Sequence, residues 1–510
     1  DLLGLRMLSL VQEVCELVED SRGERIDFGK IPHDDLQVYD MICESDTIGV
    51  FQIESRAQMQ TLPQTRPRSI EDLTVEVAII RPGPLQGNMV HPYIRRRKGL
   101  EQVTYLHPIL QPVLEETLGV ILFQEQVIQV ATIIAGFTVG EADTLRRAMS
   151  RKRSQEAMES LRQRFVEGAK RNRIGERKAN NIFEVLKGFA AYGFCKSHAA
   201  GFALLGYESA WLKKYYPTEF YAVLLNNQPM GFYTPDVIVS DAKRHGVKTL
   251  SVDINQSEKR CTVEDASIRL GFMYVKGLGE KAIDLLLGAR NQALFSSFDD
   301  FYYRTRLETN AIENLVMVDA FNAFGLSKRK TVWKIGLLEK TGPEQLPLGL
   351  TETRVSLPTL SEMEEMKFDY EVQGLSTNHH PMQVLRKGMV DDGIIMSSQL
   401  EVFPERSKVR VAGYVVTRQQ PGTAKGFSFL TLEDEEGMIN VIIKPDVYDQ
   451  HRQVFRLAPV VVVGGIVQKR DSIINIIAES LGPVEYVPGP SEDPGQGIFD
   501  RKIVGNKWRC

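Results

Sequence analysis

The chain has 510 residues, of which 43% are hydrophobic and 25% charged, and its formal net charge is −4. These values are ordinary for a globular protein of about three or four domains, and they exclude a collagen-like, coiled-coil or wholly disordered chain. The longest apolar stretch spans only residues 457–467, whereas a membrane-spanning helix needs ~20 apolar residues. The cysteines are few and far apart, which indicates reduced thiols and no zinc site.

The first residues form an apolar pattern that starts directly after Asp1. A natural amino terminus is usually looser and more polar, so we expect the chain to be cut from a longer protein. Apolar residues within 2–19 recur at helical spacing and predict a helix. Residues 81–84 read Arg-Pro-Gly-Pro, which predicts a rigid bend.

The middle of the chain changes its hydrophobic period twice. Residues 107–226 are predicted to be mostly helical, residues 251–274 to alternate as strands, and residues 275–336 to return to short helices. Residues 341–362 are rich in Pro, Gly, Thr and Ser without a clear period, which predicts a linker.

Residues 408–480 alternate as β-structure with glycines at bends. This pattern predicts a small closed barrel such as an OB-fold. The five strands are expected at 409–415, 427–432, 439–443, 460–467 and 473–477. The Gly/Pro-rich tail after Pro488 is expected to be disordered.

A basic segment interrupts the mildly acidic chain, since residues 141–180 hold twelve Lys or Arg and six Asp or Glu. Arg146 and Arg147 lie about one helical turn before a second group of cations. That second group comprises Arg151, Lys152 and Arg153. Several cations at one helix end can neutralise a triphosphate, although composition by itself favours a solvated helix face. Asp143 alone is too little to anchor a metal ion.

Residues 190–201 surround a few reactive side chains with small neighbours. Tyr192 could stack on a base or sugar, Lys196 could contact a phosphate, and His198 could press on a ribose. The competing interpretation is a tight helix junction in which His198 is a core residue, and the pattern by itself favours it.

Residues 275–282 resemble a helix-hairpin-helix turn. Gly277 and Gly279 would make a tight turn whose backbone N–H groups hold a DNA phosphate, with Lys276 and Lys281 beside it. A plain helical turn is the alternative.

The predicted barrel carries aromatic and basic residues of the kind that bind single strands. Tyr414, Phe427 and Phe429 are the candidate stacking residues. Candidate phosphate contacts are Arg410, Lys425 and Arg470. The aromatic residues could equally be barrel core, and the acidic run 433–436 fits a polyanion poorly, so a protein partner stays open.

Several long blocks of the sequence resemble one family, the C-family DNA polymerases, or bacterial DNA polymerase III alpha subunits. The matching blocks are DLLGLRML at 1–8, GVFQIESRAQM at 49–59, RPGPLQ at 81–86, GVILFQEQV at 119–127, DTLRRAMSRK at 143–152 and AAYGFCKSHAAGFALLGYESAWLKKYYPTEFYA at 190–222. The resemblance covers roughly residues 1–480. It implies template-directed addition of deoxynucleotides to a primer 3′ end, assisted by two Mg²⁺ ions on three aspartates. Asp1 occupies the place of the third aspartate, and the first two would lie upstream.

The resemblance also implies roles for individual residues. Arg146 and Arg147 look like the finger arginines that grip the triphosphate, with Lys196 nearby. Tyr192 looks like the residue that packs near the incoming nucleotide. His198 looks like the steric gate against a ribose 2′-hydroxyl, which distinguishes ribonucleotides from deoxynucleotides.

The implied fold is multidomain α+β, with a mainly helical fingers region, a helix-hairpin-helix segment and a five-stranded OB-fold barrel. The expected domains are 1–7 as the end of the palm, 8–265 as fingers, 266–335 as the helix-hairpin-helix region, 336–402 as a linker region, 403–482 as the OB-fold and 483–510 as a disordered tail.

Two branches of the family remain open. The stretches 224–247 and 374–382, and the short sequence after the barrel, favour the error-prone, damage-inducible branch used in lesion bypass over the replicative subunit. The nearest match to a sliding-clamp peptide is 345–349, where Gly349 replaces the expected aromatic.

The expected partners are primer–template DNA, dNTPs and, through the OB-fold, single-stranded template. A sliding clamp and accessory lesion-bypass proteins are further candidates, no membrane partner is expected, and the expected location is the bacterial cytoplasm at the nucleoid. The resemblance implies that two of the three catalytic aspartates are missing from the chain, which keeps a non-catalytic DNA-binding protein as the rival hypothesis. An OB domain of a tRNA-binding enzyme has no supporting nucleotide-activation motif.

Overall fold

The computed structural model describes residues 6–80, 90–150, 155–190, 193–340, 357–389, 393–422, 424–470 and 473–484. Two compact units contain these residues. We call residues 26–215 the helical unit, and residues 1–25 with 216–470 and 474–510 the barrel unit. None of the helices in the described ranges is long and apolar enough to cross a bilayer.

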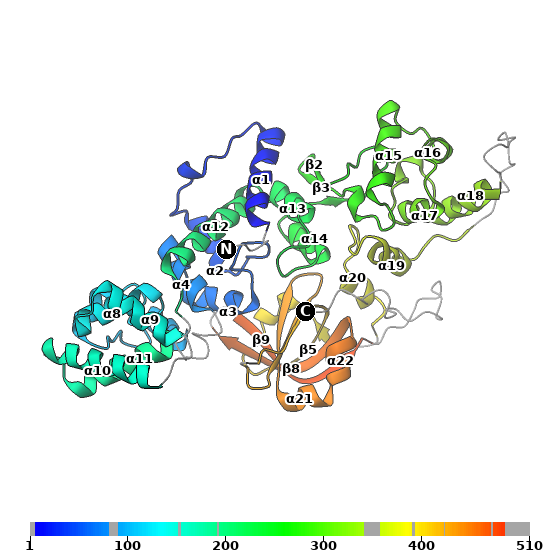
Figure 1. Ribbon diagram of the computed structural model, residues 1–510. Coiled ribbons are helices and arrows are strands. Elements are labelled where there is room, and N and C mark those ends of the chain that lie inside the picture. Colours follow the sequence, from blue (N-terminus) through cyan, green and yellow to red (C-terminus); the bar gives the residue numbers. More distant parts are fainter. Residues whose placement is uncertain are drawn as a thin grey trace. The chain divides into compact units, whose positions relative to one another are not determined.

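The helical unit contains no regular strand within its described residues (Figure 1). The helices that begin at Arg56 and Ile70 follow Ser55 and Ser69, whose hydroxyls accept hydrogen bonds from the first turn. Its elements are η1 (Phe28–Lys30), α2 (Leu36–Cys43), α3 (Arg56–Thr65), α4 (Ile70–Ile79), α6 (Val90–Arg97), η2 (Pro108–Leu110), α7 (Gln111–Leu114), α8 (Gln124–Ala135), α9 (Val139–Ser150), α10 (Gln155–Arg171), α11 (Glu176–Ala190) and α12 (Lys196–Tyr215).

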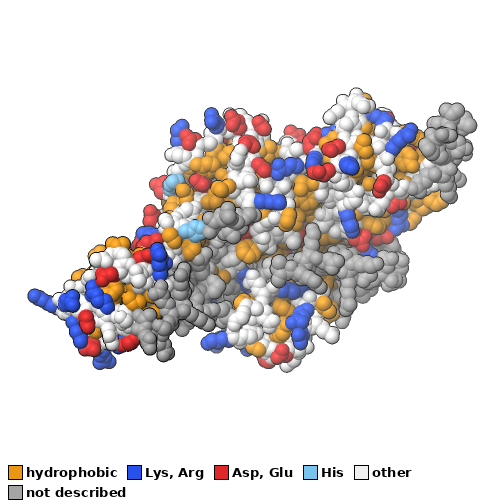
Figure 2. Space-filling model, in the orientation of Figure 1, with side chains coloured by type: hydrophobic (Ala, Val, Ile, Leu, Met, Phe, Trp, Pro, Cys, Tyr) orange, Lys and Arg blue, Asp and Glu red, His pale blue; other side chains and the backbone are white. Residues whose placement is uncertain are grey.

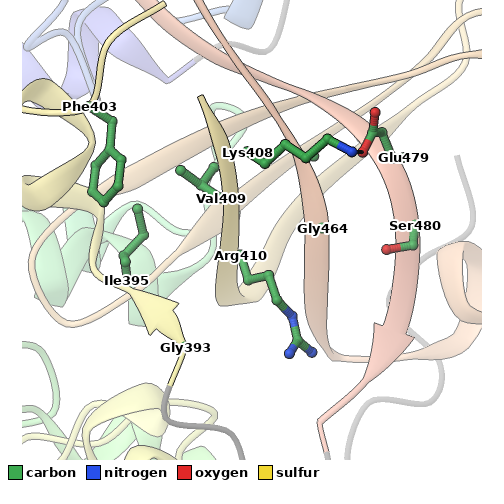
Figure 3. Close-up of a pocket in the computed structure, with 10 residues that line it drawn as sticks. Gly393, Ile395, Phe403, Lys408, Val409, Arg410, Gly464, Glu479 and Ser480 are labelled. Atoms are coloured by element: carbon green, nitrogen blue, oxygen red, sulfur yellow. Dashed lines mark ion pairs between the residues drawn. The ribbon is translucent and has the colours of Figure 1, made fainter. Parts of the chain in front are cut away.

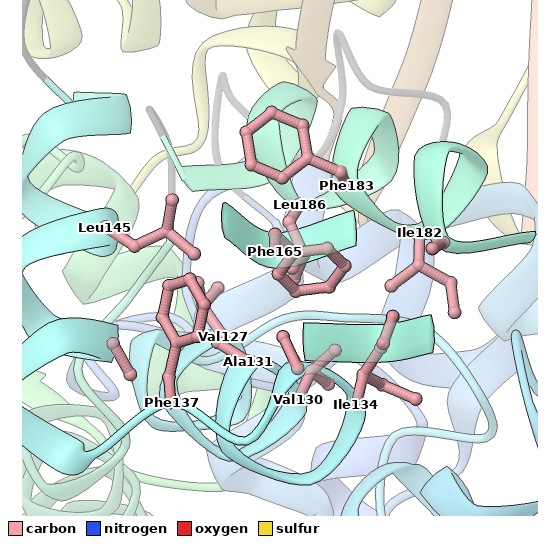
Figure 4. Packing of buried hydrophobic residues seen from close by; sticks show 14 of the residues in the cluster. Val127, Val130, Ala131, Ile134, Phe137, Leu145, Phe165, Ile182, Phe183 and Leu186 are labelled. Carbon is pink, nitrogen blue, oxygen red and sulfur yellow. The ribbon is translucent and has the colours of Figure 1, made fainter. Parts of the chain in front are cut away.

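Helices α8 to α11 pack around one apolar core (Figure 4). Phe165 of α10 lies at its centre, with ring centroids 6.0 Å from Phe137 and 5.5 Å from Phe183. Gly168 lets α10 approach the end of α8, because a Cβ there would lie 1.9 Å from the Ala135 carbonyl oxygen. Charged side chains lie on the outside of the same helices, and Figure 2 shows Lys and Arg over this exposed face.

The barrel unit begins with α1 (Met7–Arg22), which packs against α13 (Pro217–Asn226). The guanidinium of Arg22 donates two hydrogen bonds to the buried Glu219 carboxylate, at 2.7 and 2.8 Å. The following elements are α14 (Pro235–Arg244), β1 (Thr249–Leu250), β2 (Thr262–Glu264), β3 (Ser267–Arg269), η3 (Phe272–Tyr274), α15 (Glu280–Gln292), α16 (Phe298–Thr305), α17 (Thr309–Met317), η4 (Asn322–Phe324) and α18 (Lys328–Lys340).

The remaining elements of the barrel unit are the five strands of a closed barrel, β5 to β9, and the elements next to them. They are α19 (Glu362–Val372), α20 (Pro381–Arg386), β4 (Ile394–Ile395), η5 (Ser397–Glu401), β5 (Lys408–Gln419), β6 (Ser428–Glu433), β7 (Met438–Ile443), α21 (Pro445–Gln450), α22 (Arg452–Leu457), β8 (Val460–Arg470) and β9 (Ile473–Pro483). The strand order is β5-β6-β7-β9-β8, and antiparallel pairing of β5 with β8 closes the ring, while β4 pairs parallel to β5. Alternate residues point inward and form an apolar core.

A buried polar network joins the barrel to the helices before it. Arg244 of α14 donates to Glu433 of β6 at 2.7 Å and to Asp241 at 3.2 Å. The Asp241 carboxylate also accepts from the Tyr221 hydroxyl of α13 at 2.6 Å. His380, which caps α20, places Nε2 3.9 Å from the second Glu433 oxygen. Because Glu433 is 1% exposed, its charge depends on these partners.

The predicted α+β class, with helices first and a five-stranded barrel last, is confirmed. Residues 251–274 are less regular than expected, because β2 and β3 are the only strands there and the range ends in the short helix η3. The two strands are joined by a tight turn in which Asp265 and Ala266 have positive φ. The range 336–402, expected as a linker region, holds α19 and α20. The bend at 81–84, residues 341–356 and the tail after Pro488 lie outside the described residues.

We predict that Glu76→Gln stabilises the protein at high pH. Glu76 of α4 is 1% exposed, is held by the hydroxyls of Thr61 and Thr65, and burial raises the pKa of its carboxyl to about 7. Because the folded pKa exceeds the unfolded value, the wild type loses stability as pH rises from about 4.5 to 7. Urea unfolding should show the variant more stable by about 1–3 kcal/mol at pH 8 and nearly equal at pH 5. Equal stability at both pH values would contradict the assignment.

Candidate functional site

Arg146 and Arg147 lie on α9, whose opposite face is buried through Ala142 and Leu145. Asp143, one turn earlier, pairs with both arginines. Its Oδ1 accepts from Arg146 Nε at 2.9 Å, and its Oδ2 lies 2.8 Å from Arg147 Nε. The hydrogen bond from Arg146 lowers the pKa of the Asp143 carboxyl, with smaller contributions from Arg147. The two guanidinium groups differ in exposure, because the Arg147 side chain is 66% exposed and that of Arg146 only 20%.

Gln124, the first residue of α8, joins Arg146 to the segment before α12. Arg146 Nη1 donates to Gln124 Oε1 at 3.0 Å, and Gln124 Nε2 donates to the Gly193 carbonyl at 2.7 Å. The backbone N–H of Gln124 donates to the Phe194 carbonyl at 2.9 Å, next to an isolated parallel bridge between Phe123 and Phe194. Segments about 70 residues apart in the chain are thereby fixed side by side.

The first turn of α12 carries two of the predicted residues. Glu125 accepts from the Lys196 backbone N–H at 3.0 Å and from Cys195 Sγ at 3.4 Å. The Lys196 ammonium forms an ion pair with Glu116 at 2.5 Å. It also lies 5.8 Å from the centre of the Phe123 ring. A carboxylate at the start of a helix is favourable because the helix dipole is positive there.

His198, in the first turn of α12, lies between two aromatic rings. Its ring centroid is 5.2 Å from that of Phe194 and 4.2 Å from that of Phe202. Phe202 in turn contacts Phe51 at 5.1 Å. The imidazole is half-buried, and these rings restrict its movement.

The structure therefore brings Arg146, Arg147, Lys196 and His198 together within the helical unit. Helix α8 links them, because it contacts both α9 and the start of α12. Tyr192 and the cations Arg151, Lys152 and Arg153 lie outside the described residues. The sequence reasoning assigned no role to Gln124 or Glu125, although both stand in the quoted block at 119–127, and it considered Asp143 only as a metal ligand. Side-chain types and spacing gave no signal for their long-range partners.

In the predicted helix-hairpin-helix turn, Lys276, Gly277 and Gly279 are exposed and directly precede α15, whereas Val275 and Leu278 are buried. Gly277 has φ +79° and Gly279 is the N-cap of α15. The carbonyl of Lys276 accepts from Asn314 Nδ2 of α17 at 2.7 Å, and its N–H donates to the Val372 carbonyl at 3.1 Å. Both lysines, Lys276 and Lys281, are exposed. The turn thus presents a helix start and two cations to solvent, an arrangement suited to a phosphate.

The candidate DNA-binding residues of the barrel have different surroundings. Arg410 of β5 lines a cavity of about 550 Å³ with Phe403 and Gly464 (Figure 3). Lys408 lines the same cavity and pairs with Glu479 at 3.6 Å. Tyr414 packs against Tyr370 of α19, with ring centroids 6.3 Å apart.

The other barrel candidates lie elsewhere on the strands and loops. Phe427 is 37% exposed and Phe429 is half-buried, whereas Lys425 and Arg470 are exposed. Phe427 therefore offers more ring surface to a ligand than Tyr414 does.

The predicted metal ligand, Asp1, lies outside the described residues. Asp143 does not replace it, because arginines engage both of its oxygens. A cation there would compete with two guanidinium groups.

Three family models match separate parts of the chain. Residues 7–173 match the bacterial DNA polymerase III alpha subunit finger domain, residues 246–331 a helix-hairpin-helix motif, and residues 409–484 an OB-fold nucleic acid binding domain. The last two matches support binding of nucleic acid.

Curated relatives named error-prone DNA polymerase align with almost the whole chain. That of Corynebacterium glutamicum is 42% identical over 95% of this chain and 46% of its own length. Those of Anaeromyxobacter sp. (strain K) and Mycobacterium tuberculosis are each 42% identical over 96% of this chain and 45% of their own length. The chain thus spans slightly less than half the length of these relatives. A solved asparaginyl-tRNA synthetase from Pyrococcus horikoshii is 22% identical over 19% of this chain and 23% of its own, with a TM-score of 0.16.

We predict that Gly277→Ala destabilises the protein by about 1–2 kcal/mol, because the residue has positive φ and its Cβ would lie 3.2 Å from Asn314 Nδ2. Gly288→Ala is the matched control. Gly288 lies within α15, and a Cβ there meets nothing within 4 Å, so alanine should stabilise by about 0.5–1 kcal/mol. Urea unfolding of both variants measures the difference. Equal effects would show that the turn does not need glycine.

Proposed function

We propose that this chain is part of a bacterial DNA polymerase III alpha-type, error-prone DNA polymerase, the group that it resembles, and that the complete protein performs template-directed DNA synthesis. The reaction adds a deoxynucleotide to a primer 3′ end. The observation that carries the proposal is the hydrogen-bonded assembly of Arg146 on α9, Gln124 on α8 and the start of α12. Within the helical unit, this assembly holds the Arg146 guanidinium next to the segment that leads into Lys196.

The proposed role of the arginines is to bind the triphosphate of the incoming nucleotide. Arg147 supplies an exposed guanidinium that can donate two hydrogen bonds to phosphate oxygens. Asp143 keeps Arg147 and Arg146 close together despite their like charges. Lys196, whose ammonium sits beside Glu116, can exchange that partner for a phosphate. Tyr192 is proposed to pack beside the nucleotide.

The proposed role of His198 is to restrict the space beside the sugar. The rings of Phe194 and Phe202 fix the imidazole, and a fixed ring can exclude a 2′-hydroxyl sterically. Mg²⁺, bound by Asp1 and two further aspartates of the complete protein, would activate the 3′ hydroxyl and neutralise the triphosphate.

The proposed nucleic-acid partners are primer–template DNA and single-stranded template. The turn around Gly277 and Gly279, with Lys276 and Lys281, would hold a DNA phosphate without reading sequence. The barrel would hold the single strand with Phe427 and Phe429 as stacking residues and Arg410 as a phosphate contact.

The biological role that we propose is lesion bypass during DNA repair in the bacterial cytoplasm. All three reported relatives carry the name error-prone DNA polymerase. Binding of a sliding clamp or of accessory lesion-bypass proteins is a subsidiary proposal.

Primer extension by the protein from the complete open reading frame tests the proposal. Arg147→Ala should raise the KM for dNTP by about tenfold or more, while the Kd for primer–template stays within about twofold. Arg177→Ala, which removes an exposed arginine of α11, is the control and should leave both constants unchanged. DNA binding without any extension by the wild type would favour the non-catalytic alternative. A selective loss of primer binding would assign Arg147 to DNA.

His198→Ala should admit ribonucleotides. Removal of the ring opens space beside the sugar, so kcat/KM for rNTP should rise about tenfold, equivalent to ~1.4 kcal/mol of lost discrimination. The same constant for dNTP should change by less than about threefold. Single-nucleotide insertion assays measure both. Unchanged sugar discrimination would remove His198 from this role.

A further inference from the structure

In the first turn of α8, the side chains of Gln124 and Glu125 do not cap the helix and contact other segments. Phe123, at the N-cap, has an apolar side chain that cannot cap the helix. Gln126 caps it instead, because its Oε1 accepts from the N–H groups of Leu122 and Phe123 at 2.8 and 3.0 Å. Gln124 and Glu125 are therefore not needed for their own helix.

The side-chain amide of Gln124 makes hydrogen bonds to two different segments of the site. Its Oε1 accepts from Arg146 and its Nε2 donates to the Gly193 carbonyl. The Arg146 guanidinium also donates to Asp143, so contacts from two sides fix its plane. Rotation of the Gln124 amide would break both of its contacts, which makes Gln124 a coupling between α9 and residues 193–194.

Both carboxylate oxygens of Glu125 accept hydrogen bonds from residues at the start of α12. One accepts from the Lys196 N–H and the other from Cys195 Sγ. Because the first N–H groups of a helix have no partner within it, this contact orients the turn that carries Lys196 and His198.

We propose that Gln124 and Glu125 are positioning residues of the nucleotide site, an inference that rests on the proposed function. Gln124 holds Arg146 at a set distance from residues 193–194. Glu125 holds the first turn of α12, and through it His198. Neither residue contacts the reacting atoms in this scheme. Because Gln124 and Glu125 are neighbours on α8, the part of the site around Arg146 and the part around His198 move together as one rigid body.

A double-mutant cycle in the complete protein tests the Gln124 half. Gln124→Ala should raise the KM for dNTP about tenfold, with kcat reduced less and the Kd for primer–template unchanged within about twofold. Because Gln124 acts through Arg146, the double variant with Arg146→Ala should be no worse than Arg146→Ala alone. Multiplicative losses in the double variant would overturn the coupling.

Gln124→Met separates hydrogen bonding from packing, because methionine fills a similar volume and makes neither hydrogen bond. It should be as impaired as Gln124→Ala. Recovery of the wild-type KM by methionine would show that only packing matters and would overturn the proposal. A wild-type protein that extends no primer would instead defeat the proposed function, so the two failures are distinguishable.

Two substitutions test the Glu125 half. Glu125→Ala should reduce the preference for dNTP over rNTP by about threefold or more, because the turn that carries His198 loses its anchor. Glu125→Gln keeps an acceptor for the Lys196 N–H and should stay within about twofold of the wild type. An unchanged preference for dNTP over rNTP in Glu125→Ala would refute the role of Glu125. Equal losses of that preference in both variants would assign the effect to the negative charge of Glu125.

Discussion

Two backbone hydrogen bonds between residues 122–124 and Phe194 hold the candidate nucleotide site together. The N–H of Gln124 donates to the Phe194 carbonyl at 2.9 Å, and the N–H of Phe194 donates to the Leu122 carbonyl at 3.4 Å. They align the start of α8 with the start of α12. The contacts of Gln124 with Gly193 and of Glu125 with Lys196 depend on this alignment.

A second constraint acts in the barrel unit and is electrostatic. Glu433 stands at the end of β6 with almost no exposure, and an unpaired charge there would cost several kcal/mol. Arg244 meets that charge, and Asp241 in turn meets Arg244. The same acidic run at 433–436 that fits a polyanion poorly thus has an internal use, since Glu435 also pairs with Arg386 at 2.5 Å. These carboxylates face the protein's own arginines, and they need not oppose a nucleic acid bound elsewhere on the barrel.

Local structure was predictable from the sequence where one hydrophobic period extended over a whole helix or strand. The barrel strands followed from alternation, because each has one face in the core and one outside. Helix α19 was missed although Ser361 and Glu364 form a capping box, a signal readable as Ser-x-x-Glu. Composition dominated the interpretation there, since the neighbouring prolines and glycines indicated a linker. The hairpin at 262–269 is too short for alternation to define it.

Contacts between distant segments were not predictable in the same way. Asp143 could be read as a weak metal ligand or as a partner of cations, and only the helix geometry shows that it pairs with residues one turn later. Gln124 carries no chemical signature, because its role depends on a carbonyl at Gly193 that lies about 70 positions away. Such partners are set by the packing of α8, α9 and α12, which no single segment encodes.

In the proposed site, the pairing of Asp143 with two arginines would let adjacent residues of like charge bind one ligand. Neighbours on a helix point about 100° apart, so Arg146 turns toward α8 while Arg147 stays in solvent. Asp143 offers one oxygen to each and offsets their repulsion. In the proposed site the half-buried Arg146 defines the geometry, and the exposed Arg147 meets the phosphate. An anion that arrives at Arg147 meets a group already oriented through Asp143, Arg146 and Gln124, so less conformational freedom is lost on binding.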